Sequence, residues 1–228
     1  MSHVLMLCSL TGSSMDVIVG AEEVCFTVSE NLLCASSEFF QKAMSKNWNG
    51  STTRQVRLKF IEPDTFHIYV NWLYCKTLPV RIDSPGALGN AEYLELAKAY
   101  ALGDLVLNER FKNAVINAFT EKQSSVATDG RYWGPVGPVI RHIYENSGAN
   151  SKARTLLVDM YTMCGMGDWI EKWAVPEDLP WEFLRDLAVA LLNRREFDGV
   201  KEPINPCRYH EHEESEVCSS SCFQHWMS

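Results

Sequence analysis

The stretch FTVSENLLCASSEFFQKAM, residues 26–44, contains the change of hydrophobic period on which the predicted fold depends. Up to Val28 the apolar residues alternate, as they do on one face of a β-strand. Ser29 and Ser37 are residues of the type that begins a helix, and apolar residues at helical spacing follow each of them. The stretch therefore predicts the end of a strand followed by two short helices.

Three strands are predicted around this stretch. Residues 16–19, Asp-Val-Ile-Val, are rich in β-branched residues and end at Gly20, so they form a hairpin with the alternating residues 24–28. Residues 56–60, VRLKF, alternate again and predict the third strand. The chain is thus expected to build a small sheet before residue 61.

After this point every periodic segment has helical spacing. These segments cover residues 61–74, 91–103, 104–119, 139–147, 151–165 and 180–195. The second is predicted to end at Gly103, and the third to begin at the cap residue Asp104. In the last, the spacing brings together Trp181, Leu184, Ala188 and Leu191. A small sheet followed only by helices predicts an α+β fold, with the sheet capped by helices and an all-helical extension after it.

The composition is that of a globular protein, since the 228 residues are 46% hydrophobic and 22% charged. Between Lys122 and Pro138 the chain collects Ser, Gly and Pro without periodicity, which predicts a boundary. The expected divisions are an α+β domain over residues 13–121, a linker over 122–137, an all-helical extension over 138–206 and a Cys/His-rich acidic tail over 207–228.

Charge and hydropathy exclude two classes of partner. The net charge is -8, and Lys and Arg are not clustered, so neither nucleic acid nor an anionic membrane surface is an expected partner. No apolar stretch approaches the roughly 18 residues of a membrane span, and the first residues lack the pattern of a signal peptide. We therefore expect an intracellular protein of the cytoplasm, the nucleus or both, with reduced thiols.

Motifs of enzyme active sites are not found in the sequence. It contains no Gly-x-Ser-x-Gly elbow, no phosphate-binding glycine loop and no His-Glu-x-x-His. Cys164, His67 and His142 each stand alone in helical text, where packing or contact with solvent is the usual role. The sequence thus predicts that the protein is not an enzyme.

Three motifs at fixed offsets resemble the BTB/POZ domain family. Residues 16–20, DVIVG, are similar to its opening strand, and residues 56–78 look like its strand, Pro-x-x-Phe element and helix. The family signature Phe-x-x-His-x-x-x-Leu-x-x-x-Ser-x-x-Phe is matched by Phe26, Leu33, Ser37 and Phe40. Ser29 stands in place of the signature histidine, which puts local packing there in question. The resemblance covers residues 13–121, and the whole chain looks most like the short single-domain BTB/POZ proteins common in fungi.

The resemblance implies a non-enzymatic protein–protein interaction module. Such an adaptor would associate with itself as a homodimer or recruit a partner such as a cullin-type ubiquitin-ligase scaffold. Trp48 is an aromatic residue in a polar loop, which would serve either as an interface anchor or as a cover for the short helices. This loop lacks the hydrophobic-x-Glu motif often seen in cullin-binding members. The predicted partner contacts are Met44, Trp48, Phe66 and Tyr69.

The tail, CRYHEHEESEVCSSSC, contains residue types that bind zinc. The candidate ligands are Cys207, His210, His212 and Cys218. Two thiolates and two imidazoles would complete the closed tetrahedral set of a structural zinc site. Cys222 and His225 are rival ligands, and the glutamates between them also suit a solvated tail without metal. The alternative function is accordingly a zinc-dependent regulatory protein whose tail carries the activity.

Overall fold

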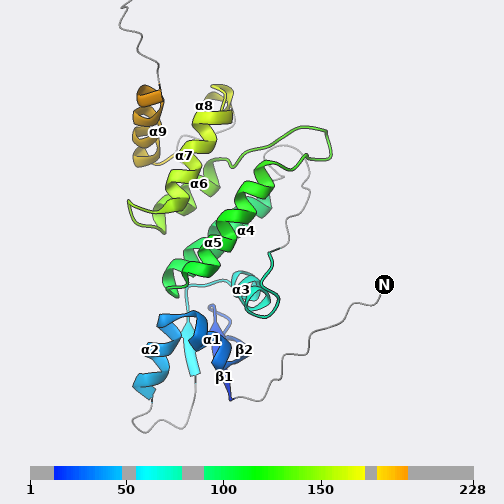
Figure 1. Cartoon of the computed structure of the whole chain (residues 1–228), viewed down its shortest axis with the longest axis vertical. Coiled ribbons are helices and arrows are strands. Elements are labelled where there is room, and N and C mark those ends of the chain that lie inside the picture. The colour runs from blue at the N-terminus through cyan, green and yellow to red at the C-terminus, as the bar shows by residue number, and fades with distance from the viewer. Residues whose placement is uncertain (1–12, 48–54, 79–89, 173–178, 195–228) are drawn as a thin grey trace, which may run out of the picture. The chain divides into compact units, whose positions relative to one another are not determined.

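The β-rich run before Gly20 forms the middle strand of a small sheet (Figure 1). The strands are β1 (Ser14–Val19), β2 (Val24–Ser29) and β3 (Gln55–Leu58), in the order β2-β1-β3. β1 pairs antiparallel with β2, opposing Val17 to Phe26, and parallel with β3, opposing Val17 to Val56. Gly20 at φ 78° and Glu23 at φ 53° turn the hairpin. The predicted hairpin and third strand are thus present.

The change of period after β2 produces two short helices, α1 (Glu30–Ser36) and α2 (Glu38–Asn47). After β3 comes α3 (Pro63–Cys75), which begins with proline in its first turn, where no N–H is needed. Lys76 caps the end of α3: its φ of 58° is left-handed, and its N–H donates to the carbonyl of Trp72.

The rest of the chain is helical in the part that the structure describes. The helices are α4 (Ala91–Leu105), α5 (Glu109–Gln123), α6 (Gly137–Glu145), α7 (Lys152–Cys164), α8 (Asp168–Glu171) and α9 (Trp181–Arg194). α4 packs against α3, α5 and α6. Between α4 and α5, the buried Glu92 and Lys122 form an ion pair at 3.4 Å.

The boundary between α4 and α5 differs from its prediction. α4 continues past Gly103 to Leu105, and Asp104 is a helical residue rather than a cap. α5 is capped by Asn108, whose Oδ1 accepts from the N–H of Phe111 at 3.0 Å. The sequence contains two residues of capping type four positions apart, Asp104 and Asn108, and the later one begins the helix.

The segment that precedes α6 accepts hydrogen bonds from α4 and from α7. Tyr93 of α4 donates to the carbonyl of Trp133, and Tyr161 of α7 donates to that of Pro135 at 3.0 Å. One continuous hydrophobic core runs from Met15 in the sheet to Leu187 in α9. The helices after residue 136 therefore share a core with the sheet, and the predicted α+β fold with a helical extension is confirmed.

The computed structural model describes residues 13–47, 55–78, 90–172 and 179–194. The chain divides into two units, residues 1–193 and residues 194–228. The described elements up to residue 193 belong to the first unit, and of the second unit only Arg194, at the end of α9, is described.

Candidate protein interface

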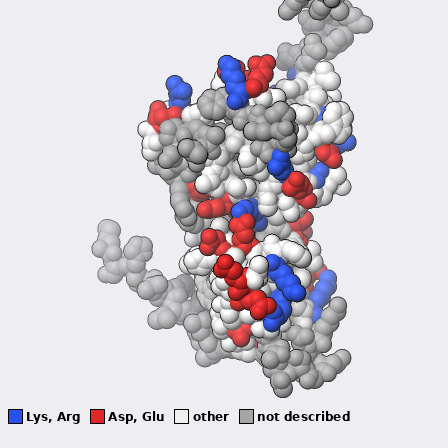
Figure 2. All heavy atoms as spheres, turned by 180° about the vertical axis from the view of Figure 1, so that it is seen from behind, with Lys and Arg blue, Asp and Glu red and all other residues white. Residues whose placement is uncertain are grey.

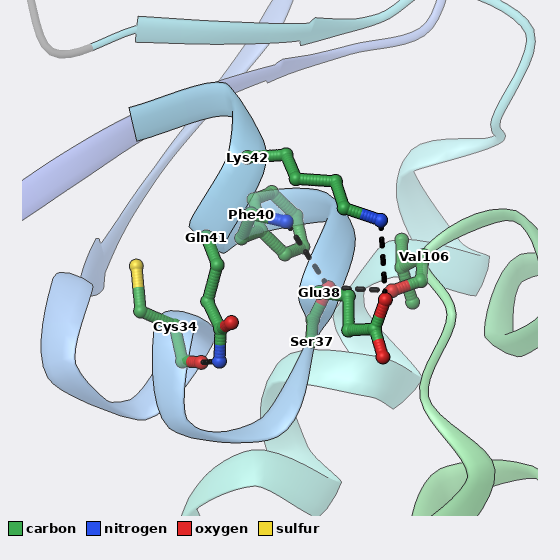
Figure 3. A network of polar contacts seen from close by, with 7 residues as sticks. All are labelled: Cys34, Ser37, Glu38, Phe40, Gln41, Lys42 and Val106. Atoms are coloured by element: carbon green, nitrogen blue, oxygen red, sulfur yellow. Dashed lines mark hydrogen bonds and ion pairs between the residues drawn. The ribbon is translucent and has the colours of Figure 1, made fainter. Parts of the chain in front are cut away.

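Ser37 connects the start of α2 to the turn between α4 and α5 (Figure 3). Its buried Oγ donates to the carbonyl of Val106 at 2.5 Å and accepts from the N–H of Phe40 at 3.2 Å. The hydroxyl thus caps α2 and bonds a residue far away in sequence with the same atom. This signature serine therefore fixes the position of two elements relative to each other.

The turn after α4 presents two leucines to solvent. Leu105 is 48% exposed and Leu107 50% exposed, whereas Val106 between them is fully buried. Leu107 has a φ of 54°, and the buried Asn108 that follows donates to the hydroxyl of Tyr69 at 3.1 Å. Anchored on both sides, the turn holds the two leucines in a fixed position.

α2 lies beside this turn, and side chains in its N-terminal half form a hydrogen bond and an ion pair. Gln41 donates to the carbonyl of Cys34 at 2.5 Å, and Lys42 pairs with Glu38 at 3.1 Å (Figure 3). Its outward side chains are polar, and its apolar side packs against the core. We call α2 together with Leu105 and Leu107 the α2–turn surface.

Of the predicted partner contacts, the structure places two in the core. Phe66 and Tyr69 are 0% exposed, since Phe66 lies against Phe26 with ring centroids 5.0 Å apart and Tyr69 against Phe111 at 4.8 Å. The prediction that these two side chains contact a partner is therefore wrong, because the surrounding rings enclose them. Both side chains lie in the core beneath this surface. The hydroxyl of Tyr69 accepts a hydrogen bond from Asn108, the residue after Leu107.

Of the other two predicted contacts, the structure describes only Met44. Met44 of α2 is half-buried and packs against the core. Trp48 lies outside the described residues. Sequence reasoning missed Leu105 and Leu107, since they follow the same helical spacing as buried residues. The local signal that could have found them was the capping amide of Asn108, which places them in a turn.

Ser29, in place of the signature histidine, forms no capping hydrogen bond through its side chain. Its backbone N–H donates instead to the hydroxyl of Tyr74 at 3.2 Å. Ser29 is thus the N-cap residue of α1, as predicted, but its hydroxyl does not make the capping hydrogen bond. Contact between the end of β2 and α3 is made by the tyrosine.

A cavity lies where the segment before α6 meets α7 and α8. The cavity measures about 810 Å³ and is lined largely by aromatic and sulfur-containing residues, among them Trp133, Trp169, Met160 and Cys164. Trp169 packs so closely on Gly134 that a Cβ there would lie 2.5 Å from the ring. Cys164 lies at the end of α7, and its Sγ accepts a hydrogen bond from Gln123 at 3.4 Å.

His142 is the histidine with a perturbed environment. Its Nε2 is buried without a hydrogen-bond partner among the described residues. Burial lowers the pKa of His142, the charge of Lys98 lowers it further, and Glu145 and Glu62 oppose the change. The imidazole therefore favours its neutral form in the folded protein.

The predicted zinc ligands, Cys207, His210, His212 and Cys218, lie outside the described residues. Within the described residues, no group of three or more His, Cys, Asp or Glu side chains could hold a metal ion. Zinc in the tail stays a prediction. Its test is the zinc content of the purified protein, compared with that of Cys207→Ala and His212→Ala.

The described surface mixes charges of both signs. On the face drawn in Figure 2, basic and acidic side chains lie interspersed among uncharged ones. Such a distribution favours a protein partner over the phosphate backbone of a nucleic acid. In the same part of the chain, none of the helices combines the length and apolarity needed to cross a bilayer.

Part of the chain is similar to known proteins. Residues 6–110 match the family model of the BTB/POZ domain. Human zinc finger and BTB domain-containing protein 21 is 34% identical over 84 residues, which are 37% of this chain and only 8% of that protein. The solved structures that match include two BTB domains, each with a TM-score of 0.35. The BTB domain of human gigaxonin is 14% identical, with 45% of this chain and 74% of that chain covered; the BTB domain of zebrafish PATZ1 is 18% identical, with 47% and 76% covered.

Proposed function

Residues 6–110 are a BTB/POZ domain, and on that premise we propose that this protein is a non-enzymatic adaptor that binds a protein partner through the α2–turn surface. Domains of this family are in general protein–protein interaction modules. Fold alone does not fix the site of binding, so the choice of surface depends on the geometry around α2.

The observation that carries the proposal is the pair of exposed leucines beside α2. Leu105 and Leu107 stand on a turn whose neighbours Val106 and Asn108 are buried and hydrogen-bonded. Because the backbone of this turn is already ordered, binding through the leucines would cost little beyond the rotamer freedom of their side chains. They can therefore act as anchors beside the polar outer side chains of α2, which would form part of the rim.

The proposed partner class is a cullin-type ubiquitin-ligase scaffold, and self-association is the other partnership. Met44 and Trp48 stay predicted contacts, since α2 leads directly into the loop that contains Trp48. That loop lacks the glutamate often found in cullin-binding relatives, so the apolar anchors would have to contribute more of the affinity.

The experiment is isothermal calorimetry of the full chain with the N-terminal region of a cullin. Leu105→Asp should weaken binding at least tenfold, which corresponds to about 1.4 kcal/mol. Phe60→Asp is the matched control, because Phe60 is 99% exposed at the turn after β3 and its removal should leave affinity unchanged. Circular dichroism would verify that both variants are folded.

Two outcomes would count against the proposal in different ways. Undetectable binding of the wild type would remove the cullin class. Partners could then be isolated from the native cell by affinity capture and identified by mass spectrometry. Equal binding by Leu105→Asp and wild type, to whichever partner is found, would remove the α2–turn surface as the site.

A further inference from the structure

The cavity bounded by the segment before α6, by α7 and by α8 has the size and lining of a small-molecule site. Its volume of about 810 Å³ lies within the range of sites that enclose drug-sized ligands. Three aromatic residues line it, namely Tyr132, Trp133 and Trp169. The thioethers of Met160 and Met166 add polarizable apolar surface, which packs favourably against aromatic rings. These walls suit a flat aromatic guest.

Hydrogen bonds and close packing hold the walls in place before any ligand binds. The indole N–H of Trp133 donates to the carboxylate of Asp129 at 3.2 Å. Trp169 lies edge-to-face on Tyr161, with ring centroids 5.2 Å apart, and packs directly on Gly134. A site that is already ordered loses little conformational freedom when a ligand enters, so more of the contact energy appears as affinity.

The charged groups around the cavity indicate which kind of ligand fits. In the lining, Asp168 is paired with Lys172 at 2.9 Å, so its negative charge is largely offset. The guanidinium of Arg131, also in the lining, forms no ion pair or hydrogen bond with any residue that the structure describes. The nearby carboxylate of Asp129 accepts from the backbone N–H of Arg131 at 3.0 Å rather than from its guanidinium. An unpaired cation beside aromatic walls favours a ligand with an anionic group and disfavours a cationic one.

We propose that this cavity binds a small planar aromatic molecule that has one anionic group, a carboxylate or a sulfonate. The ring lies against the aromatic side chains, and the anionic group forms a charge-assisted hydrogen bond with Arg131. The cavity includes no residue of the α2–turn surface, so the proposal stands independently of the proposed function. For a ligand of about 20 non-hydrogen atoms, a Kd on the order of 10 to 100 μM is expected.

The first test uses two fluorescent probes that differ in the anionic group. Anilinonaphthalene sulfonate has a sulfonate, whereas phenylnaphthylamine has the same rings without it. Both fluoresce strongly in apolar surroundings, so titration of the full chain gives their affinities. Arg131→Gln should weaken binding of the sulfonate probe by about three- to tenfold and change the affinity of the neutral probe by less than about twofold.

Arg110→Gln is the matched control for the charge. Arg110 is exposed in the first turn of α5, whereas Gln123, the residue of α5 that lines the cavity, lies at the other end of that helix. The control removes the same charge from the protein at a distance from the cavity. It should therefore leave the affinities of both probes unchanged.

The second test asks whether the probes occupy this cavity rather than another apolar surface. Met166 and Met163 are each 67% exposed, but of the two only Met166 lines the cavity. Met166→Asn should weaken binding of both probes by at least about threefold, because it removes apolar wall. Met163→Asn is the matched control and should leave both affinities unchanged. Circular dichroism would verify that the variants are folded.

Three results would overturn the proposal. Undetectable binding of both probes by the wild type would show that the cavity does not take such a ligand. Equal affinity of wild type and Arg131→Gln for the sulfonate probe would show that Arg131 does not recognise the anionic group. Equal losses in Met166→Asn and Met163→Asn would place the probes on a different surface.

Discussion

α3 and α9 are both helices with apolar residues at helical spacing, yet the structure covers them to different degrees. Rings from β2, α2 and α5 contact the aromatic residues of α3, with centroids 4.8 to 6.5 Å apart. α9 has such contacts on one side, where Phe183 lies against Tyr144 and Tyr161, while Trp181 is largely exposed. Helical spacing thus shows which side chains share a face, whereas the number of covered faces depends on elements distant in sequence.

The largest expected effect comes from replacing a buried tryptophan of α3. Trp72 of α3 is buried, stacks on Tyr69 at 6.2 Å and lies 5.1 Å from Phe111. Trp72→Ala should lower the free energy of unfolding by about 3–5 kcal/mol, because it removes a large buried side chain and leaves a cavity. Urea denaturation measures this loss. A loss below about 1 kcal/mol would show that α3 is not enclosed as described.

The comparison also explains what sequence could and could not predict. Strand alternation, the change of period after Val28 and the position of Ser37 are local features, and each was predicted correctly. Phe66 and Tyr69 were expected at a partner interface and are core residues. Their burial depends on rings brought in by three other elements, which no window of local sequence contains.

The same limit applies at α9. Its sequence spacing groups Trp181, Leu184, Ala188 and Leu191; Leu184 is half-buried against the core, whereas the other three are exposed. The adjacent apolar set, which includes Phe183 and Leu187, is the one that packs. Since two apolar sets follow helical spacing in this segment, periodicity alone cannot choose between them. The choice is made by the partners that α6 and α7 offer.

An intermediate effect is expected where one buried hydroxyl joins two elements. Ser37→Ala removes the cap of α2 and leaves the carbonyl of Val106 without this donor. The expected loss is about 1–2 kcal/mol in the free energy of unfolding. Ser45→Ala is the control: Ser45 is exposed and donates only to the nearby carbonyl of Lys42, so its loss should stay within about 0.5 kcal/mol. Equal losses in both variants would contradict a special role for Ser37.

Burial of His142 should also make the stability of the fold depend on pH. Burial lowers the pKa of His142 below its unfolded value of about 6.5, so the unfolded state takes up a proton more readily than the folded state. Stability that is present at pH 7.5 should then decline as the pH falls toward 5.5. In His142→Gln this part of the decline should be absent from urea midpoints measured across the range. His67→Gln is the control: His67 is exposed, so this variant should keep the decline in stability seen in the wild type. A decline of the same size in wild type and His142→Gln would show that His142 is not its source.

The smallest expected effect is the counterpart of the first, with the same substitution made in α9. Trp181→Ala should change the free energy of unfolding by no more than about 0.5 kcal/mol, because its ring is 71% exposed and mostly solvated already. Urea denaturation measures this change beside that of Trp72→Ala. A loss above about 1 kcal/mol would mean that Trp181 is covered within the chain, and the contrast between α3 and α9 would fail.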